Sequence, residues 1–490
     1  MITNSHTETD IVRNSSTSPV NKKCSMTNEL TEKIKSPQMK YINEGKINIL
    51  NEKYEKDTNE SINIKEYEPY DYCTSGKPTN YSDTLFHLLK FFVGTGIFAL
   101  PSAFKDVGYI IGIVGIIFVT SMYAYCIHLL FKTEYVLCKR RQIPNLSYAN
   151  TVHAAFEEVF PKYRWLATSG KFFTNSFFVI YESGGCAVYV IFISSNLKQL
   201  LDYYLNDDLN LQLIMLYVTL PMILNCWIRN LKLLSPLSAT ANFILVLCFI
   251  LVFWYEFQVI PTFEGKEAFA DFSKIPAYLN TILFATSCTG IILPLKSEMR
   301  HPAKFISPTG VLNVAFIPVS LLYAAFGFFG YLKYGNDVAE SITLNLPKNE
   351  LPAQVIRGLS LLPVFISYHL CYYVVLDIVW KHYLKNKSKK KDFIREYAFR
   401  TLFPIIIFIM AYAIPNLKTF ISLVGAFGIC ATSLIIPIVV HTLVFWNMYQ
   451  TKAKFYVFFF KNIILFSVAM IIFVSGILES IVGVFELYHK

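Results

Sequence analysis

The chain has 490 residues, of which 54% are hydrophobic and 16% aromatic, and its formal net charge is +10. So apolar a composition excludes an ordinary soluble protein and is typical of a protein with several membrane-spanning helices. The positive charge also raises nucleic acid as a partner. The basic residues, however, are concentrated in two loops between apolar segments, and the rules of membrane topology explain that pattern without nucleic acid.

Residues 1–82 form a polar segment that differs from the rest of the chain. They are rich in Asn, Ser, Thr, Glu and Lys and contain no apolar run long enough for a core, which predicts disorder. The chain does not begin with basic residues followed by an apolar run, so no signal peptide is predicted. We therefore expect a disordered cytosolic tail over 1–82 and a transmembrane domain over 83–490.

Apolar segments of membrane-spanning length follow this tail. Each is close to the ~17–25 residues that a bilayer requires, and none alternates with the period of two that strands show, so helices are predicted. The sequence therefore predicts an all-α integral membrane protein with 11 transmembrane helices. The predicted ranges are 84–104, 109–131, 172–197, 211–228, 236–258, 277–295, 309–332, 353–379, 399–414, 419–446 and 456–485.

The first apolar segment is interrupted at its middle. The stretch HLLKFFVGTGIFALP, from His87 to Pro101, carries Gly94 and Gly96 on either side of Thr95. Each glycine weakens a helix by about 1 kcal/mol, and lipid tolerates an unwound backbone only where it faces protein or a water-filled cavity. One interpretation is close helix packing; the other is a discontinuous helix whose exposed N–H groups bind a carboxylate.

The sixth segment has a second interruption. In FATSCTGIILP, from Phe284 to Pro294, Gly290 and Pro294 are expected to interrupt the helix, and hydroxyl side chains precede them. Two interrupted segments, five apart in order, are what an inverted repeat of five plus five helices places at a shared midplane site. This pairing favours a transporter. The predicted substrate-binding residues are Gly94, Thr95, Gly96, Thr286, Ser287 and Gly290.

The charge of the loops predicts the orientation of the protein. Basic residues gather between positions 132 and 171 and between 381 and 400, whereas the loops expected on the other side are mixed or acidic. The positive-inside rule then places the N-terminus in the cytosol and the C-terminus outside the cell or in a lumen. The Lys-rich run 385–391 is a topology signal, with contact to anionic lipid as a second use. Plasma and endolysosomal membranes fit equally well.

These segments resemble the proton-coupled amino acid transporters of the amino acid/auxin permease family, particularly its insect members. The matching pieces are HLLK…GTGI…LP at 87–101, VLCKRRQIPNLSYA at 136–149, VYVIF at 188–192, IRNL at 228–231, ILPL at 292–295, SITLNLP at 341–347 and LKTFISLVGAFG at 417–428. The resemblance implies a LeuT-like 5+5 inverted repeat with an eleventh helix and with helices 1 and 6 broken. It also implies symport of small neutral amino acids with protons, the proton being the coupling ion and no other cofactor being needed.

The chain departs from the family's usual residues in both broken segments. Phe91 and Phe92 stand where the family has Gly-Asn, Ser287 stands where it has an acidic residue, and Lys296 replaces a glutamate. The two phenylalanines predict a narrow site that prefers glycine, alanine or proline. The same changes favour a second hypothesis, an amino-acid-sensing transceptor with this fold and little or no transport.

Two ionisable residues are candidates for proton coupling. His87 precedes Gly94 by two helical turns, or about 10 Å, and the resemblance assigns it to coupling, which suits a side chain with a pKa near 6.5. Its alternative role is to cap the end of the helix. Glu182 lies well inside the third segment, where a carboxylate by default marks an ion or substrate path. Its alternative is a neutral acid that is hydrogen-bonded to a neighbouring helix.

The sequence contains no recognisable catalytic or metal-binding motif. The chain has no CxxC pair and no phosphate loop or nucleophile–base arrangement, so neither a metal site nor an enzyme is predicted. The expected partners are small neutral amino acids, protons and the lipid bilayer.

Overall fold

The computed structural model describes residues 67–72, 78–92, 94–229, 231–258, 262–380, 389–446, 448 and 451–489. Over these residues the chain is helical, and its one isolated β-bridge joins Thr79 to Met299. Most of the predicted tail lies outside the described residues. The α-helices are α3 (Tyr81–Phe92), α4 (Leu100–Val107), α5 (Tyr109–Arg141), α6 (Tyr148–Val159), α7 (Arg164–Leu205), α8 (Leu211–Cys226), α9 (Leu231–Phe257), α10 (Ile275–Thr286), α11 (Thr289–Ser297), α12 (Val311–Tyr334), α13 (Leu351–Val379), α14 (Lys389–Ala413), α15 (Leu417–Val424), α16 (Ile436–Phe445) and α17 (Lys452–His489).

The predicted helical membrane architecture is confirmed. Among the described residues, 8 helical stretches are long and apolar enough to cross a membrane. They are Tyr109–Arg141, Arg164–Leu205, Thr240–Phe257, Phe272–Ser297, Val311–Asp337, Leu351–Val379, Leu417–Phe445 and Lys452–Glu486. The other predicted ranges also coincide with helix: 84–104 with α3 and α4, 211–228 with the short α8, and 399–414 with α14.

The first predicted interruption is present where the glycines indicated it. Helix α3 ends at Phe92, and a 3-10 turn, η2 (Thr95–Ala99), leads into α4. Gly94 between them is extended, with φ −125° and ψ −175°. Pro101 occupies the first turn of α4, where its missing N–H costs no intrahelical hydrogen bond. The backbone therefore leaves the helix at Gly94 and re-enters it at Thr95.

The second interruption lies earlier than the sequence predicted. Helix α10 ends at Thr286 and α11 begins at Thr289, so the break falls at Ser287 and Cys288. Gly290 and Pro294, which were expected to interrupt the segment, both lie inside α11. The reason is a tertiary hydrogen bond, because the N–H of Cys288 donates to the hydroxyl of Tyr123 on α5 at 2.9 Å instead of to a helical carbonyl.

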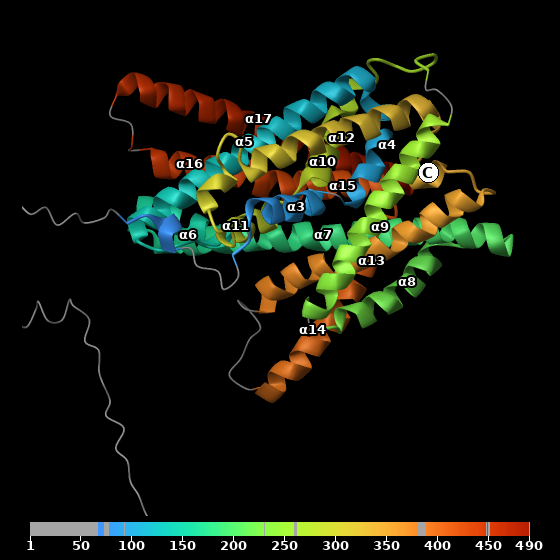
Figure 1. The fold of residues 1–490 in the computed structure, drawn as a ribbon, viewed down its shortest axis with the longest axis horizontal. Helices are drawn as coiled ribbons and strands as arrows, with labels where there is room; N and C mark the ends of the chain where they lie inside the picture. Colours follow the sequence, from blue (N-terminus) through green and yellow to red (C-terminus); the bar gives the residue numbers. More distant parts are fainter. Residues whose placement is uncertain are drawn as a thin grey trace, which may run out of the picture. The chain divides into compact units, whose positions relative to one another are not determined.

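Helix α7 is the centre of the arrangement. It has 42 residues and crosses the whole bundle in Figure 1, where it packs against α6, α8, α13, α14 and α15. Helix α10 packs against α4, α5, α15 and α17, and α12 packs against α3, α4 and α5. The two broken segments are therefore held among long, continuous helices.

Two helical features were not predicted. Helix α6 lies in the stretch expected to be a loop, and packs against α7 and α16. The hydroxyl of its Tyr148 donates to the carbonyl of Thr432. Between α15 and α16 the chain forms two π-helical turns, η8 (Gly425–Ile429) and η9 (Ala431–Ile435). Such turns are frequent at functional sites, and these lie against α7 and α5 respectively.

Candidate functional site

The two broken segments meet. A Cβ added to Gly96 in η2 would lie 2.6 Å from the Cα of Ala285 in α10, so only glycine permits this approach. The Tyr323 hydroxyl on α12 is within hydrogen-bond distance of the Phe92 carbonyl oxygen and lies 2.9 Å from that of Ala285. A hydroxyl carries one proton and therefore donates to one of these carbonyls at a time. Tyr323 thus links the ends of α3 and α10.

The first break contains a buried hydroxyl beside the start of a helix. Thr95 Oγ1 is buried without a hydrogen-bond partner among the described residues. The first N–H groups of a helix lack intrahelical acceptors, and they lie at its positive end. Gly94 differs from Gly96, because a Cβ at Gly94 would meet no atom within 4 Å. The backbone at Gly94 therefore borders open space.

At the second break one hydroxyl remains unpaired. Thr286 Oγ1 donates to the carbonyl of Ile282 at 2.8 Å, so its own helix satisfies it. Thr289 Oγ1 lies 2.8 Å from the hydroxyl of Tyr123 and 2.6 Å from that of Ser433. Ser287 Oγ, in contrast, is buried and makes no hydrogen bond of normal geometry among the described residues, and the polar side chain of Tyr181 is close enough to interact with it.

Glu182 faces the second break. Its side chain is only 7% exposed, and its Oε1 would lie 3.5 Å from a Cβ added to Gly290 on α11. The thiol of Cys371 on α13 is its other neighbour. Gly185, on the same helix, is buried, yet a Cβ there would meet no atom within 4 Å. This part of α7 therefore borders α11 on one side and open space on another.

His87 is not part of this cluster. It lies on α3 and is exposed, five residues before the helix ends at Phe92. The structure therefore places Gly96, which follows Gly94 and Thr95, against Ala285, which precedes Thr286 and Ser287, and it places Glu182 against Gly290. It leaves His87 apart and Thr286 bonded to its own helix.

The sequence predicted that Phe91 and Phe92 both narrow the site, and the structure contradicts this. Phe92 is fully buried, with its ring centroid 4.9 Å from that of Phe316 on α12, whereas Phe91 is 44% exposed. Successive residues of a helix point about 100° apart, and here packing against α12 takes up Phe92 alone.

Sequence reasoning missed the partner of Lys296. This lysine, 1% exposed, forms an ion pair with Glu134 of α5, which is 2% exposed. The rings of Tyr70 and Phe131 each lie with their centroid 5.4 Å from its Nζ. An unpaired buried ammonium would be strongly unfavourable, and the lysine in the apolar run ILPLK was the available signal that a carboxylate lies nearby.

Comparison with known proteins identifies the family of the chain. The family profile described as "Transmembrane amino acid transporter protein" matches residues 77–482. The chain is 33% identical over 405 residues to "Proton-coupled amino acid transporter-like protein pathetic" of Drosophila melanogaster, an alignment that covers 82% of this chain and 85% of that protein. It is 23% identical over 415 residues to "Probable amino acid transporter skat-1" of Caenorhabditis elegans, with 82% and 90% covered. The chain is therefore a multi-pass integral membrane protein of the transmembrane amino acid transporter family, the amino acid/auxin permeases.

Proposed function

We propose that the protein is a secondary active transporter that moves small neutral amino acids together with protons. One observation carries the proposal. Two broken helices meet at Gly96 and Ala285, and among the described residues each break holds a buried hydroxyl, of Thr95 and of Ser287, without a partner of normal geometry. Unsatisfied buried polar groups are costly, so their presence at two adjoining breaks favours a polar solute there.

Each break has a distinct role in this proposal. The carboxylate of the amino acid binds at Gly94, Thr95 and Gly96, where the N–H groups of Thr95 and Gly96 form the positive end of the stretch made by η2 and α4. The N–H of Gly94 itself donates to the carbonyl of Phe92 at 2.9 Å, so Gly94 contributes the open space beside these groups. The hydroxyl of Ser287 receives the other polar end of the solute. Thr286 positions the end of α10 through its bond to Ile282.

The proposed preference for small neutral substrates follows from the family resemblance. The structure is compatible with it, because Gly96 lies so close to the backbone of Ala285 that any side chain at Gly96 would collide with it. Alanine, glycine and proline are the substrates proposed.

Glu182 and His87 are the proposed proton-coupling residues. Glu182 borders Gly290 in the first turn of α11, so its charge state acts directly on the helix that follows the break. His87 is exposed on α3, two turns before the first break, and is proposed as the group through which protons reach that break. No cofactor other than the proton is required, and no enzymatic step is proposed.

The proposed fold is a LeuT-like 5+5 inverted repeat followed by an eleventh helix. Helices α3–η2–α4 and α10–α11 are then the first members of the two repeats, and α17 is the helix that follows them. The N-terminal segment is cytosolic by the positive-inside rule, and the end where α10 and α15 begin and α17 ends faces the exterior or a lumen. We call this the outer end.

A transceptor is the second candidate, and one contact favours it. Residues 67–72, in the predicted tail, include a 3-10 turn that packs against α5. There Tyr135 donates to Glu68 at 2.8 Å, and the ring of Tyr70 lies over Lys296 of α11. A movement of α11 would therefore reach the segment that leads into the tail.

Uptake in proteoliposomes tests the proposal. The full chain is reconstituted and given labelled alanine, glycine, proline, arginine and glutamate, with an inward proton gradient or with none. We expect uptake of the small neutral amino acids that depends on the gradient. Efficient arginine uptake would overturn the substrate class. Amino-acid binding, measured by thermal shift, without uptake in either condition would support the transceptor instead.

A further inference from the structure

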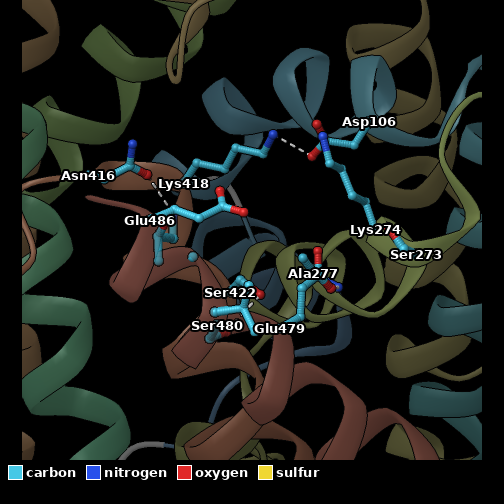
Figure 2. Close-up of a pocket in the computed structure, with 13 residues that line it drawn as sticks. Asp106, Ser273, Lys274, Ala277, Asn416, Lys418, Ser422, Glu479, Ser480 and Glu486 are labelled. Carbon is cyan, nitrogen blue, oxygen red and sulfur yellow. Dashed lines mark hydrogen bonds and ion pairs between the residues drawn. The ribbon is translucent and has the colours of Figure 1, made fainter. Parts of the chain in front are cut away.

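A charged pocket of about 350 Å³ lies at the outer end, between α10, α15 and α17 (Figure 2). Its lining carries both signs of charge, with Asp106 from α4, Lys274 from the start of α10, Lys418 from α15, and Glu479 and Glu486 from α17. The substrate site proposed above does not include any of these groups. They surround the outer halves of both broken helices.

Glu479 holds the first turn of α10. Its Oε2 accepts a hydrogen bond of 2.7 Å from the backbone N–H of Ala277, the third residue of that helix. A first-turn N–H has no intrahelical acceptor, and a carboxylate at the positive end of a helix forms a charge-assisted bond. Asn280, on the next turn, also reaches α17, where its Nδ2 donates to the carbonyl of Ile472 at 3.4 Å.

The other broken helix has a parallel attachment. Asp106, near the end of α4, forms an ion pair with Lys418 in the first turn of α15. Asp106 is only 6% exposed. The outer halves of both broken helices, α4 and α10, are therefore each tied to a continuous neighbour by one carboxylate. Opening the site toward this end requires α10 to move, and the contact between Glu479 and Ala277 opposes that movement.

We propose that Glu479 is a proton-sensitive latch on α10, closed when its carboxylate is ionised and released when it is protonated. The pocket gives protons from the outer side access to this group. The charged groups that face it are Asp106, Lys274, Lys418 and Glu486, while Glu340 binds the adjoining Asn416 and Leu417. The two ammonium groups favour the ionised, closed form, and Asp106 opposes it. That the pocket faces the outer side rests on the membrane orientation given with the proposed function.

Hydrogen exchange of the α10 amides tests the latch without any transport measurement. The purified full chain in nanodiscs is followed by mass spectrometry at pH 5.0 and 7.5, with rates corrected for intrinsic chemical exchange. We expect protection over 275–280 to be about two- to fivefold lower at pH 5.0, the loss that removing a charge at a helix end produces. Glu479→Gln should show the low protection at both pH values. Glu486→Gln, a matched change on the same helix and pocket, should behave like the wild type.

Several outcomes would overturn the latch. The first is that the protection of 275–280 in the wild type does not change with pH. The second is that this protection still falls at pH 5.0 in the Glu479→Gln variant. An equal effect of Glu486→Gln would also do so, since it would indicate a general charge effect. The wild-type measurement stands even where the variant fails to fold. The exchange experiment uses no substrate, so it tests the latch even if the protein binds amino acids without transporting them. The uptake assay alone tests whether the protein is a transporter, so the two proposals can fail separately.

Discussion

The carboxylate of Glu182 on α7 lies directly beside Gly290 on α11, where an added Cβ would be 3.5 Å from its Oε1. Lipid does not surround this carboxylate, because the side chain is buried and its other neighbours are Cys371 and Tyr181. A proton on Glu182 therefore changes the charge next to a helix break, which is the physical requirement for a coupling residue.

Two substitutions separate a coupling role from a structural one. Glu182→Gln keeps the shape and hydrogen bonding but cannot titrate, so we expect a folded protein whose uptake no longer responds to an imposed pH gradient. A structural role predicts that Gln is nearly silent and that Glu182→Leu lowers the melting temperature. Gly358→Ala on α13 serves as the control, because its Cβ would meet no atom within 4 Å and it lies outside the proposed site, so the pH response should stay intact.

The two glycines of the first break should respond differently to alanine. Gly94→Ala meets no neighbouring atom, whereas Gly96→Ala collides with the backbone of Ala285. We expect Gly94→Ala to fold normally and to weaken amino-acid binding, and Gly96→Ala to lose about 1–3 kcal/mol of stability through overpacking. Melting curves with and without alanine measure both effects. Unchanged binding in Gly94→Ala would remove this backbone from the site.

The buried pair of Lys296 and Glu134 should be costly to break and cheap to replace. Lys296→Met leaves a buried carboxylate unpaired, and we expect a loss of about 3–5 kcal/mol. Adding Glu134→Leu should restore most of this. Arg140→Met is the matched control, because its pair with Glu158 is 38% and 31% exposed and is worth about 0–1 kcal/mol. Thermal denaturation in detergent gives the comparison, and equal losses for both single variants would contradict it.

Glu340 should make stability depend on pH. Burial raises the pKa of this carboxyl, although the N–H of Leu417 and the ammonium of Lys418 act in the opposite direction. The folded protein then keeps the proton at pH values where the unfolded chain, with a pKa of about 4.3, has released it. Unfolding therefore releases protons, and this contribution to stability is present at low pH and is lost as the pH rises.

The melting temperature of Glu340→Gln measures this effect. Relative to the wild type, we expect it to rise between pH 4.5 and pH 7.5, since glutamine mimics the protonated side chain. Asp271→Asn should show the reverse trend, because hydrogen bonds from Ser273 lower the pKa of Asp271 and its stabilising effect disappears as the pH falls. Parallel trends in the two variants would refute the assignment.

His87 is expected to contribute the pH dependence of transport near neutrality. Histidine is the side chain that changes its charge in the physiological pH range, so His87→Ala should flatten the uptake profile between pH 5.5 and pH 7.5 while leaving the melting temperature unchanged. His301→Ala, also exposed, should retain the wild-type profile. An unchanged profile for His87→Ala would exclude the histidine from coupling.

The sequence by itself determined that the protein is helical and membrane-spanning, and it located the break at Gly94. These properties are local, because a bilayer demands a certain apolar length and glycine weakens a helix wherever it stands. The family resemblance through GTGI and LKTFISLVGAFG was equally readable, since it depends on the order of residues alone.

The tertiary structure decided the second break and the composition of the site. Tyr123, far away in the sequence, binds the N–H of Cys288 and moves the break away from Gly290. Phe91 and Phe92 point to different surroundings, and Glu182 meets Gly290, because the rotation of each helix about its axis is set by packing. Hydropathy carries no information on that rotation, and an interrupted helix also loses the periodicity from which a facing side could be inferred.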